Sequence, residues 1–285
     1  MSDAIAWAER LRVGAWTLEG FSLGGVETAV HVPELKLAID VGRGGAPLVR
    51  CDHLALTHTH MDHAGGVPYL IALRQLYGMR LPTLYVPAQM AEAMTTMLRS
   101  WEAVQRYSIE CPVVPVEAGE RYAIAQNVWL EPFRTYHPVP SNGYLLVRER
   151  KKLKAELAGV PGPSLAAMKA RGEVIEDIVK DKVLAVTGDT LVEVLDKQPH
   201  ILEAETLLIE CTFLDDRKSL ADSRAGGHVH VSELMERAQV FGGGRLVLSH
   251  FSQIYDEAEV PGLLEPFRQA SGAEVLAFPM SARPR

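Results

Sequence analysis

Three histidines and one aspartate lie within one short stretch of the chain, ALTHTHMDHAGG at residues 55–66. His58 and His60 directly follow an apolar run that predicts a buried strand, so both imidazoles can point toward one ion at the end of that strand. Asp62 and His63 follow after a turn and can point toward a second ion close by. Imidazole nitrogens and carboxylate oxygens suit zinc, although manganese or iron accepts the same donors. The spacing therefore predicts half of a site for two metal ions.

Three more side chains can complete this site, because each follows the carboxyl end of an apolar run. His137 ends PFRTYH, Asp189 lies in AVTGDT, and His250 ends RLVLSH. A single histidine after a strand is more often structural than a ligand, but the shared placement of all three favours ligands. Asp189 is the predicted bridge, since a carboxylate can offer one oxygen to each cation. The predicted first site is His58, His60, His137 and Asp189, and the predicted second site is Asp62, His63, Asp189 and His250.

The elements that must position these ligands alternate between strands and helices in two successive runs. That order predicts an α+β fold in which two mixed sheets pack together with helices outside, an αββα sandwich. The apolar patterns predict strands in the first 57 residues and at 83–87, 112–149, 182–190, 206–213 and 245–252, and helices at 64–77, 88–106 and 231–241, with a closing helix and strand after them.

One segment, at about 148–177, interrupts this pattern. It opens with RERKKLK, which has five basic residues in seven positions, and contains Pro-Gly-Pro at 161–163. A solvated surface face is the ordinary explanation for such a charge run, but the segment also fits an arm that projects from the sandwich. We therefore expect a single domain over residues 1–285 with a basic arm inserted in it.

The bulk composition excludes several classes of protein. The chain has 285 residues and a formal net charge of −7, whereas a generic nucleic-acid binder is basic unless its positive charge is concentrated locally. The three cysteines, Cys51, Cys111 and Cys211, are far apart and show no paired spacing, which favours a reducing cytoplasm. No apolar run approaches the roughly 18 residues of a membrane span, and the first residues do not have the pattern of a signal peptide, so we expect neither membrane insertion nor secretion.

The order and spacing of THTHMDH, His137, TGDT and His250 resemble those of the metallo-β-lactamase superfamily of hydrolases. Three further stretches, LEGFSLGGVETAV, LLIECTFLDD and GGHVHVSEL, are similar to ribonuclease Z, the tRNA 3′-processing endonuclease, and most of all to its short plant-type forms. The similarity runs from about residue 18 to residue 255. It implies the metallo-β-lactamase fold, two zinc ions per chain, precursor tRNA as the substrate and a homodimer.

The same resemblance implies the catalytic groups. His228 in GGHVH matches the family's catalytic histidine, and Glu210 in IECTF matches the carboxylate that pairs with it, although a strand-end acid that caps a helix is the alternative for Glu210. A neighbouring carboxylate raises the pKa of an imidazole, so His228 can protonate the leaving 3′-oxygen near pH 7. Asp62 is expected to hold or deprotonate the attacking water, Asp40 to hydrogen-bond the metal loop, and His230 to be structural.

The departures from the family concern the substrate rather than the metals. The commoner bacterial forms have His-Glu-Ala-Thr at 209–212, where this chain has Ile-Glu-Cys-Thr, and His-Ser-Thr at 228–230, where it has His-Val-His. Ile254 replaces the usual arginine, which removes a phosphate contact. The segment GVPGPSLAAMKARGE resembles the Gly-Pro-containing arm with which ribonuclease Z grips the tRNA elbow, in an abbreviated form.

The leading hypothesis is a zinc-dependent phosphodiesterase that removes the 3′ trailer from tRNA precursors by attack of a metal-bridged hydroxide. The alternative is a hydrolase of the same superfamily that acts on another small phosphodiester or ester. A catalytically silent RNA-binding or scaffold protein is a third possibility, which the complete set of ligands and the candidate acid disfavour.

Overall fold

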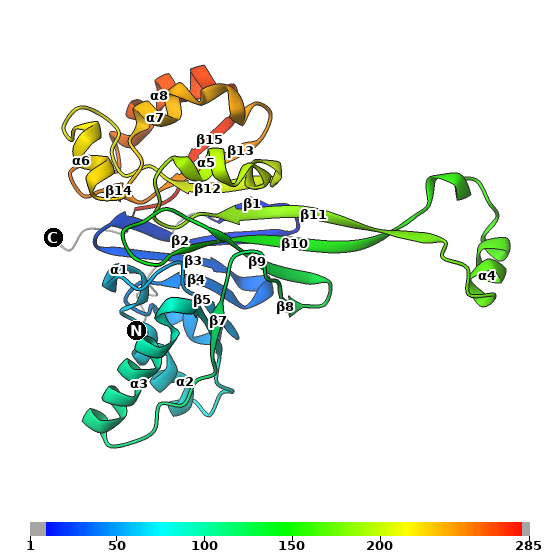
Figure 1. The fold of residues 1–285 in the computed structure, drawn as a ribbon, viewed down its shortest axis with the longest axis horizontal. Coiled ribbons are helices and arrows are strands. Elements are labelled where there is room, and N and C mark those ends of the chain that lie inside the picture. The colour runs from blue at the N-terminus through cyan, green and yellow to red at the C-terminus, as the bar shows by residue number, and fades with distance from the viewer. Residues whose placement is uncertain (1–9, 281–285) are drawn as a thin grey trace, which may run out of the picture.

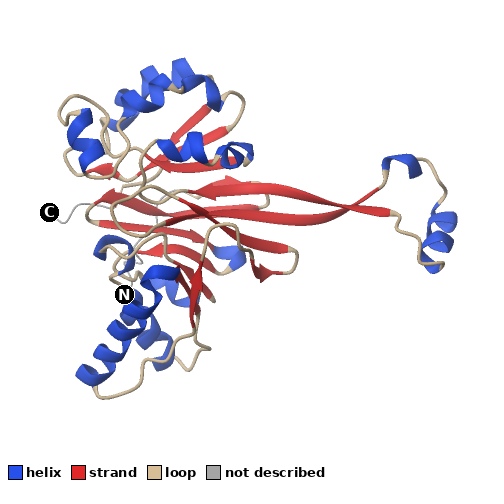
Figure 2. Ribbon diagram, in the orientation of Figure 1, coloured by secondary structure: helices blue, strands red, loops and turns tan. Residues whose placement is uncertain are grey.

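Two β-sheets packed face to face, with helices on both outer surfaces, make up the protein in this computed structural model, which describes residues 10–280 (Figure 1). The predicted αββα sandwich of two mixed sheets is therefore confirmed, as the colouring by secondary structure also makes plain (Figure 2). The first sheet has the strand order β1-β2-β3-β4-β5-β6-β7, with β14 beside β2, and the second has the order β15-β13-β12-β11-β10-β9-β8.

The strands of the first sheet are β1 (Leu11–Val13), β2 (Trp16–Gly24), β3 (Glu27–Val32), β4 (Leu37–Val41), β5 (His53–Ala55), β6 (Thr83–Pro87), β7 (Val113–Val116) and β14 (Phe251–Ser252). Those of the second sheet are β8 (Tyr122–Ala125), β9 (Val128–Arg134), β10 (Asn142–Leu153), β11 (Glu176–Val186), β12 (Thr206–Glu210), β13 (Arg245–Ser249) and β15 (Glu274–Ala277). The helices are α1 (Met61–Ala64), α2 (Val67–Leu76), α3 (Ala91–Gln105), α4 (Gly162–Ala170), α5 (Glu193–Lys197), α6 (Leu220–Ala225), α7 (Val231–Glu236) and α8 (Val260–Ser271).

Apolar side chains point alternately to the two faces of each buried strand. They fill the core between the sheets and the two layers between the sheets and the helices. In β4, Leu37 and Ile39 point into the core between the sheets, whereas Ala38 packs against the helical layer that contains α2 and α3. In β12, Leu208 faces the same inter-sheet core and Leu207 packs with α7 and α8. Each strand therefore contributes to two apolar layers, which is why the strands read as continuous apolar runs in the sequence.

The parallel strands place their carboxyl ends, which are followed by the predicted ligands, at one rim of the sandwich. The strands β4, β5, β6 and β7 run parallel to one another, as do β11, β12, β13 and β15 in the other sheet. Because parallel strands have their carboxyl ends at the same edge, the loops that follow β5, β11, β12 and β13 meet there.

Two glycines allow the loops at this rim to approach one another closely. A Cβ atom on Gly66, just before α2, would lie 2.1 Å from the backbone nitrogen of Gly44. Gly188 has a φ of +61°, and a Cβ there would lie 2.5 Å from the Cβ of Thr57. Backbone packing of this kind leaves no room for a side chain, so both positions require glycine.

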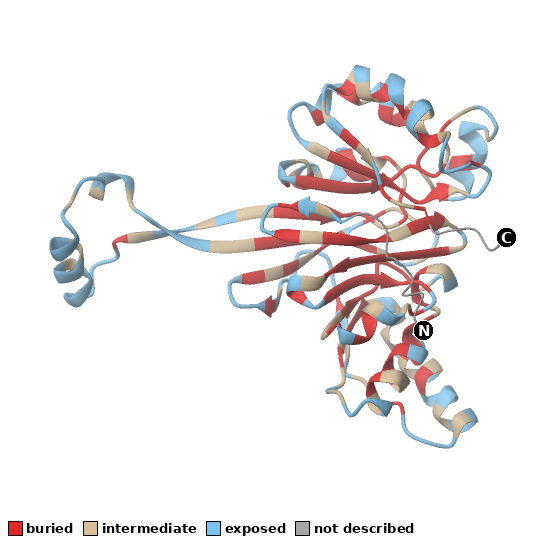
Figure 3. Cartoon of the chain, turned by 180° about the vertical axis from the view of Figure 1, so that it is seen from behind, coloured by how far each residue is buried: buried red, intermediate tan, exposed pale blue. Residues whose placement is uncertain are grey.

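The expected insertion at 148–177 is the outer part of a long hairpin rather than a separate loop. Strands β10 and β11 leave the second sheet together and carry α4 at their tip (Figure 1). Their pairing continues without interruption from Val147 opposite Lys182 to Leu153 opposite Glu176. The outer part of the hairpin is mostly exposed, in contrast to its buried inner part (Figure 3).

The helix expected at 231–241 is in fact divided into two parts. Arg237, whose guanidinium pairs with Asp196, has a φ of −108° and a ψ of 12° and so ends α7. A 3-10 helix, η6 (Ala238–Phe241), follows and brings Phe241 against Phe267 of α8. Within residues 10–280, no helix has the length and apolar character needed to cross a membrane.

Candidate metal centre

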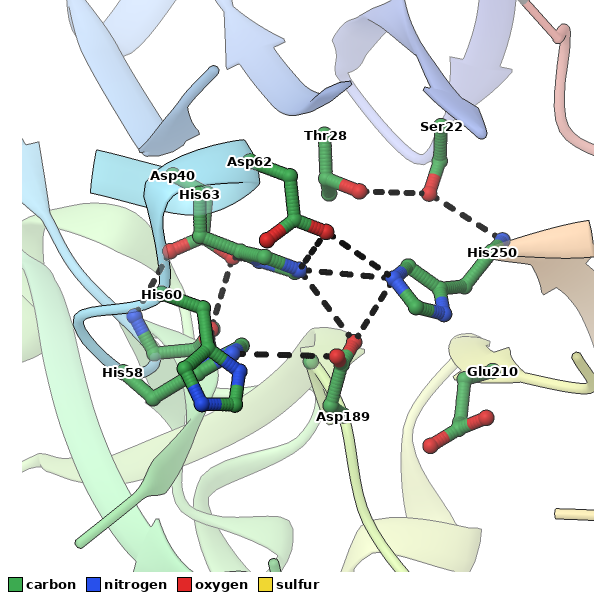
Figure 4. A network of polar contacts seen from close by, with 12 residues as sticks. Ser22, Thr28, Asp40, His58, His60, Asp62, His63, Asp189, Glu210 and His250 are labelled. Carbon is green, nitrogen blue, oxygen red and sulfur yellow. Dashed lines mark hydrogen bonds and ion pairs between the residues drawn. The ribbon is translucent and has the colours of Figure 1, made fainter. Parts of the chain in front are cut away.

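The seven predicted ligands converge at the rim where the strands end. Figure 4 labels all of them except His137. The ligand atoms of the first predicted site lie within 4.8 Å of one another. The same holds for the ligand atoms of Asp62, His63 and His250, which are the second predicted site without Asp189. Asp189 lies between the two sets. Its Oδ2 is 3.7 Å from His58 Nε2, and its Oδ1 is 3.3 Å from His250 Nε2. One carboxylate therefore presents a different oxygen to each set, an arrangement that suits a bridging ligand.

Hydrogen bonds on the outer side of two imidazoles fix which nitrogen faces the centre. His63 donates from Nδ1 to Asp40 Oδ2 at 2.8 Å. The Thr57 hydroxyl donates to the same carboxylate at 2.7 Å, so it accepts from His58 Nδ1 at 3.1 Å. In both rings the Nε2 lone pair is then free to bind a metal ion, an arrangement that is common around protein metal sites. The expected contact of Asp40 with the metal loop is present.

His137 and His250 are held in the same way. His137 donates from Nδ1 to the carbonyl oxygen of Gly227 at 3.1 Å, so its Nε2 faces the centre, 3.4 Å from Nδ1 of His60. The Thr212 hydroxyl donates to Glu210 at 2.6 Å and therefore accepts from His250 Nδ1 at 3.0 Å. This leaves the His250 Nε2 lone pair directed at the cluster.

Two buried polar atoms at the middle of the cluster lack a hydrogen-bond partner within the described chain. These two atoms are His58 Nε2 and Asp189 Oδ1. In addition, Nε2 of His63 and Nε2 of His250 face each other at 3.4 Å. Buried lone pairs left unpaired or opposed are unfavourable unless a cation lies between them. The donor set therefore fits a pair of divalent ions, and its mixture of nitrogen and oxygen atoms suits zinc.

Burial and charge determine the protonation of the cluster. Burial alone would raise the pKa of Asp189, but the imidazoles of His250 and His63 hold it well below its usual range. Burial lowers the pKa of His58 to about 2, so this ring is neutral. Burial lowers the pKa of His63, but the charges of Asp189 and Asp40 outweigh this effect and raise the pKa well above its usual value. A proton on His63 and a bound cation are alternative ways to neutralise the carboxylates, so metal binding would release protons.

Two residues of the site have a strained backbone. His250 and Asp40 have φ values of 61° and 57°, in the left-handed region that side chains other than glycine rarely occupy. The backbone N–H of His250 donates to Ser22 Oγ at 3.0 Å, and Ser22 Oγ lies 2.9 Å from Thr28 Oγ1 (Figure 4). Strain of this kind persists only where the surroundings over-determine the conformation, and here β2 and β3 hold His250 in its orientation.

The predicted acid–base pair lies next to the metal centre. His228 Nδ1 is 3.1 Å from Oε1 of Glu210, and the His228 ring lies 5.3 Å from that of His137 and 5.2 Å from that of His250. Burial lowers the pKa of His228, but the charge of Glu210 outweighs this effect and raises the pKa to about 9. The backbone N–H of Thr190 also donates to Glu210, at 2.7 Å. His228 can therefore carry a proton at neutral pH within reach of a substrate at the centre.

Several residues of the site were not expected from the sequence. They share one role, which is to form a hydrogen bond with a predicted ligand or with Glu210 and so hold it in place. The only hint in the sequence is that three of them are threonines next to motif residues. The unexpected residues are Thr57, Thr190, Thr212, Ser22 and Gly227.

His230, in contrast, caps α7, because its Nδ1 accepts from the backbone N–H of Ser232. This contact fits the structural role expected for it.

Comparison with known proteins gives consistent results at the level of family and fold. Residues 38–251 match the family model described as "Beta-lactamase superfamily domain". The chain is 33% identical to the chloroplastic tRNase Z of Arabidopsis thaliana, over 95% of this chain and 77% of that protein, and 34% identical to a second Arabidopsis tRNase Z, over 88% and 90%. The crystal structure of the short form of human tRNase Z superposes with a TM-score of 0.57 at 17% identity, covering 92% of this chain and 95% of that one.

A substitution at the shared carboxylate tests the bridge. Asp189→Ala removes one oxygen from each ligand set, so we expect the purified protein to lose bound metal, as measured by elemental analysis, while its circular dichroism spectrum stays folded. Asp216→Ala, at an exposed position, is the matched control and should keep the wild-type metal content. Retention of two ions by Asp189→Ala would contradict the bridging role.

Proposed function

Because the chain belongs to the tRNase Z family of the beta-lactamase superfamily, we propose that it cleaves the 3′ trailer from tRNA precursors and leaves a 3′-hydroxyl on the tRNA. The family makes it a metal-dependent hydrolase that acts on RNA. The observation that carries the more specific proposal is the position of the His228–Glu210 pair beside two facing sets of metal ligands. That arrangement combines a proton donor with a site for a phosphodiester.

We propose two zinc ions as the metals. The first would be held by His58, His60, His137 and Asp189, and the second by Asp62, His63, Asp189 and His250. When bound, such a pair supplies a nucleophilic water of lowered pKa and neutralises charge on the phosphate. The buried and unpaired Nε2 of His58 and Oδ1 of Asp189 support this assignment.

His228 is proposed as the general acid that protonates the leaving 3′-oxygen of the tRNA ribose. Glu210 orients it, since its Oε1 accepts from His228 Nδ1 and so leaves the Nε2–H edge of the ring for the substrate. Asp62 is proposed to orient the attacking water, because its partly exposed carboxylate lies at the edge of the cluster, 3.5 Å from His63 Nε2 and 3.7 Å from His250 Nε2. The acid thus belongs to the loop between α6 and α7, and the water-orienting group belongs to α1.

The hairpin of β10 and β11 is proposed to hold the body of the tRNA. Its exposed surface carries Lys151 and Lys152, for which no carboxylate within residues 10–280 lies at ion-pair distance, whereas Arg150 pairs with Asp181 at 2.7 Å. Free lysines on a projecting arm can contact phosphates far from the metal centre. Positive charge concentrated there would bring a polyanion to a chain whose net charge is −7.

A homodimer is proposed through the outer surface of α2 and α3. This surface exposes large apolar side chains around a groove of about 580 Å³, and the exposed fraction is 59% for Tyr69, 48% for Trp101 and 71% for Val104. Two adjacent helices that present apolar side chains can pack against their own copy about a two-fold axis. In such a dimer the arm of one subunit could hold tRNA for the metal centre of its partner.

The function and the acid are tested together with a 3′-extended tRNA transcript. We expect the wild-type protein to release the trailer and leave a mapped 3′-hydroxyl on the tRNA. His228→Ala should keep its metal but lose turnover by roughly 10²–10⁴-fold, because the proton for the leaving oxygen is missing. Metal content by elemental analysis is the control. Wild-type turnover in His228→Ala would rule out the general-acid role, and an uncut transcript would rule out the proposed substrate.

Shortening the arm tests its role in binding. Lys151 pairs with Ile178 across the hairpin, so residues 152–177 can be replaced by an Asn-Gly turn that preserves the pairing of the inner part. The loss of kcat/KM should be far greater for precursor tRNA than for bis(p-nitrophenyl) phosphate, and the salt dependence of tRNA binding should become less steep. Equal losses on both substrates would mean that the arm is structural.

The dimer surface is tested by sedimentation velocity. Trp101→Glu places a charge in the apolar groove, and we expect it to shift the wild-type dimer to a monomer. Val240→Glu, which alters an exposed apolar side chain of η6 instead, is the matched control and should sediment like the wild type. A monomeric wild-type protein would contradict the homodimer itself.

A further inference from the structure

A hollow of about 600 Å³ lies directly beside the metal centre. Its walls come from η3 (Ala88–Met90), the loop after β7, the end of β9 and the loop that leads into β10. His137 belongs to both places, since it lines the hollow and turns its Nε2 toward His60 within the first ligand set. A substrate strand that extends from the metal centre past His137 therefore enters this hollow.

The walls carry groups suited to a nucleotide. The Arg134 side chain is exposed, and within residues 10–280 no carboxylate lies at ion-pair distance from its guanidinium, which lies 5.6 Å from the centre of the Tyr136 ring. A guanidinium without a carboxylate partner is available to bind a phosphate in bidentate fashion. Gln89 offers an exposed amide, and Pro138 and Pro140 offer exposed apolar surface.

We propose that this hollow binds the start of the 3′ trailer, with Arg134 on the phosphate that follows the scissile one; the inference rests on the proposed function. His228 marks the tRNA side of the scissile phosphate, because it protonates the leaving 3′-oxygen. His228 and Gly227 both approach His137, yet neither lines the hollow. The trailer continues from the other side of the phosphorus, so the hollow is the adjoining site left for it.

One wall residue opposes phosphate binding and so limits what the hollow can hold. Glu117 lines it with an exposed carboxylate, which would repel a second phosphate placed nearby. The same carboxylate can accept a hydrogen bond from a base amino group or from the ribose 2′-hydroxyl, the group that distinguishes RNA from DNA. The composition of the walls fits one ribonucleotide followed by one phosphate better than an extended run of backbone.

The test compares two precursors of the same tRNA, one with a trailer of a single nucleotide and one with a trailer of ten. Only the longer one has a phosphate beyond the scissile one. For Arg134→Ala in the full-length protein, we expect kcat/KM on the long trailer to fall on the order of 10- to 100-fold more than on the short trailer, the effect of losing a charged hydrogen bond. The change should be mainly in KM, and Arg134→Lys should restore part of it.

The control is Arg50→Ala, an exposed arginine that precedes β5 and so lies at the opposite end of the strand from the metal ligands. It should affect both precursors equally. Equal losses on both trailers for Arg134→Ala, or weaker binding of mature tRNA without a trailer, would overturn the assignment and place the tRNA side in the hollow. A wild-type protein that cuts neither precursor, but still hydrolyses bis(p-nitrophenyl) phosphate, would overturn the proposed function and this inference with it.

Discussion

The structure depends on a buried carboxylate, Asp189, held between two groups of imidazoles that turn their lone pairs toward it. An unpaired charge in a protein interior costs several kcal/mol even after relaxation, so this arrangement is stable only when positive charge lies within it. His63 can supply a proton, and metal ions can supply more charge at the same place. Metal ions bound at this rim would therefore be linked to folding, because their binding would stabilise the fold that presents the ligands.

The architecture delivers these ligands because parallel strands end at a common edge and because four of the five imidazoles, all except His60, are held by a hydrogen bond on the outer side. Asp40, at the end of β4, receives hydrogen bonds from Thr57 and His63, so it fixes His63 directly and His58 through Thr57. Gly188 lets the loop after β11 pack onto Thr57, which brings Asp189 under the same loop. The ligand positions thus depend on contacts between strand ends rather than on the conformation of any single loop.

Sequence reasoning could predict features that depend on local spacing, such as His58, His60, Asp62 and His63, and the strand-end placement of the other ligands. It could not predict Thr212, because the partner His250 is 38 positions away and only the folded sheet shows that they meet. The continuation of the strands into a long hairpin could not be predicted for a related reason. Its charge run looks like the start of a loop, but Arg148 and Arg150 pair across the strands with Asp181, so the strand continues.

Thr212 also links the two halves of the site. A hydroxyl has one proton, and this proton is donated to Oε2 of Glu210, so His250 Nδ1 must donate to the hydroxyl oxygen. The orientation of a metal ligand and that of the carboxylate behind His228 are then fixed by the same atom. Glu210 also accepts from the backbone N–H groups of Thr190 and Val229, which leaves it little freedom to turn. A displacement of the second ligand set would therefore reach His228, the proposed general acid, through Thr212 and Glu210, so the orientation of the proposed metal ligands and that of the proposed acid are coupled.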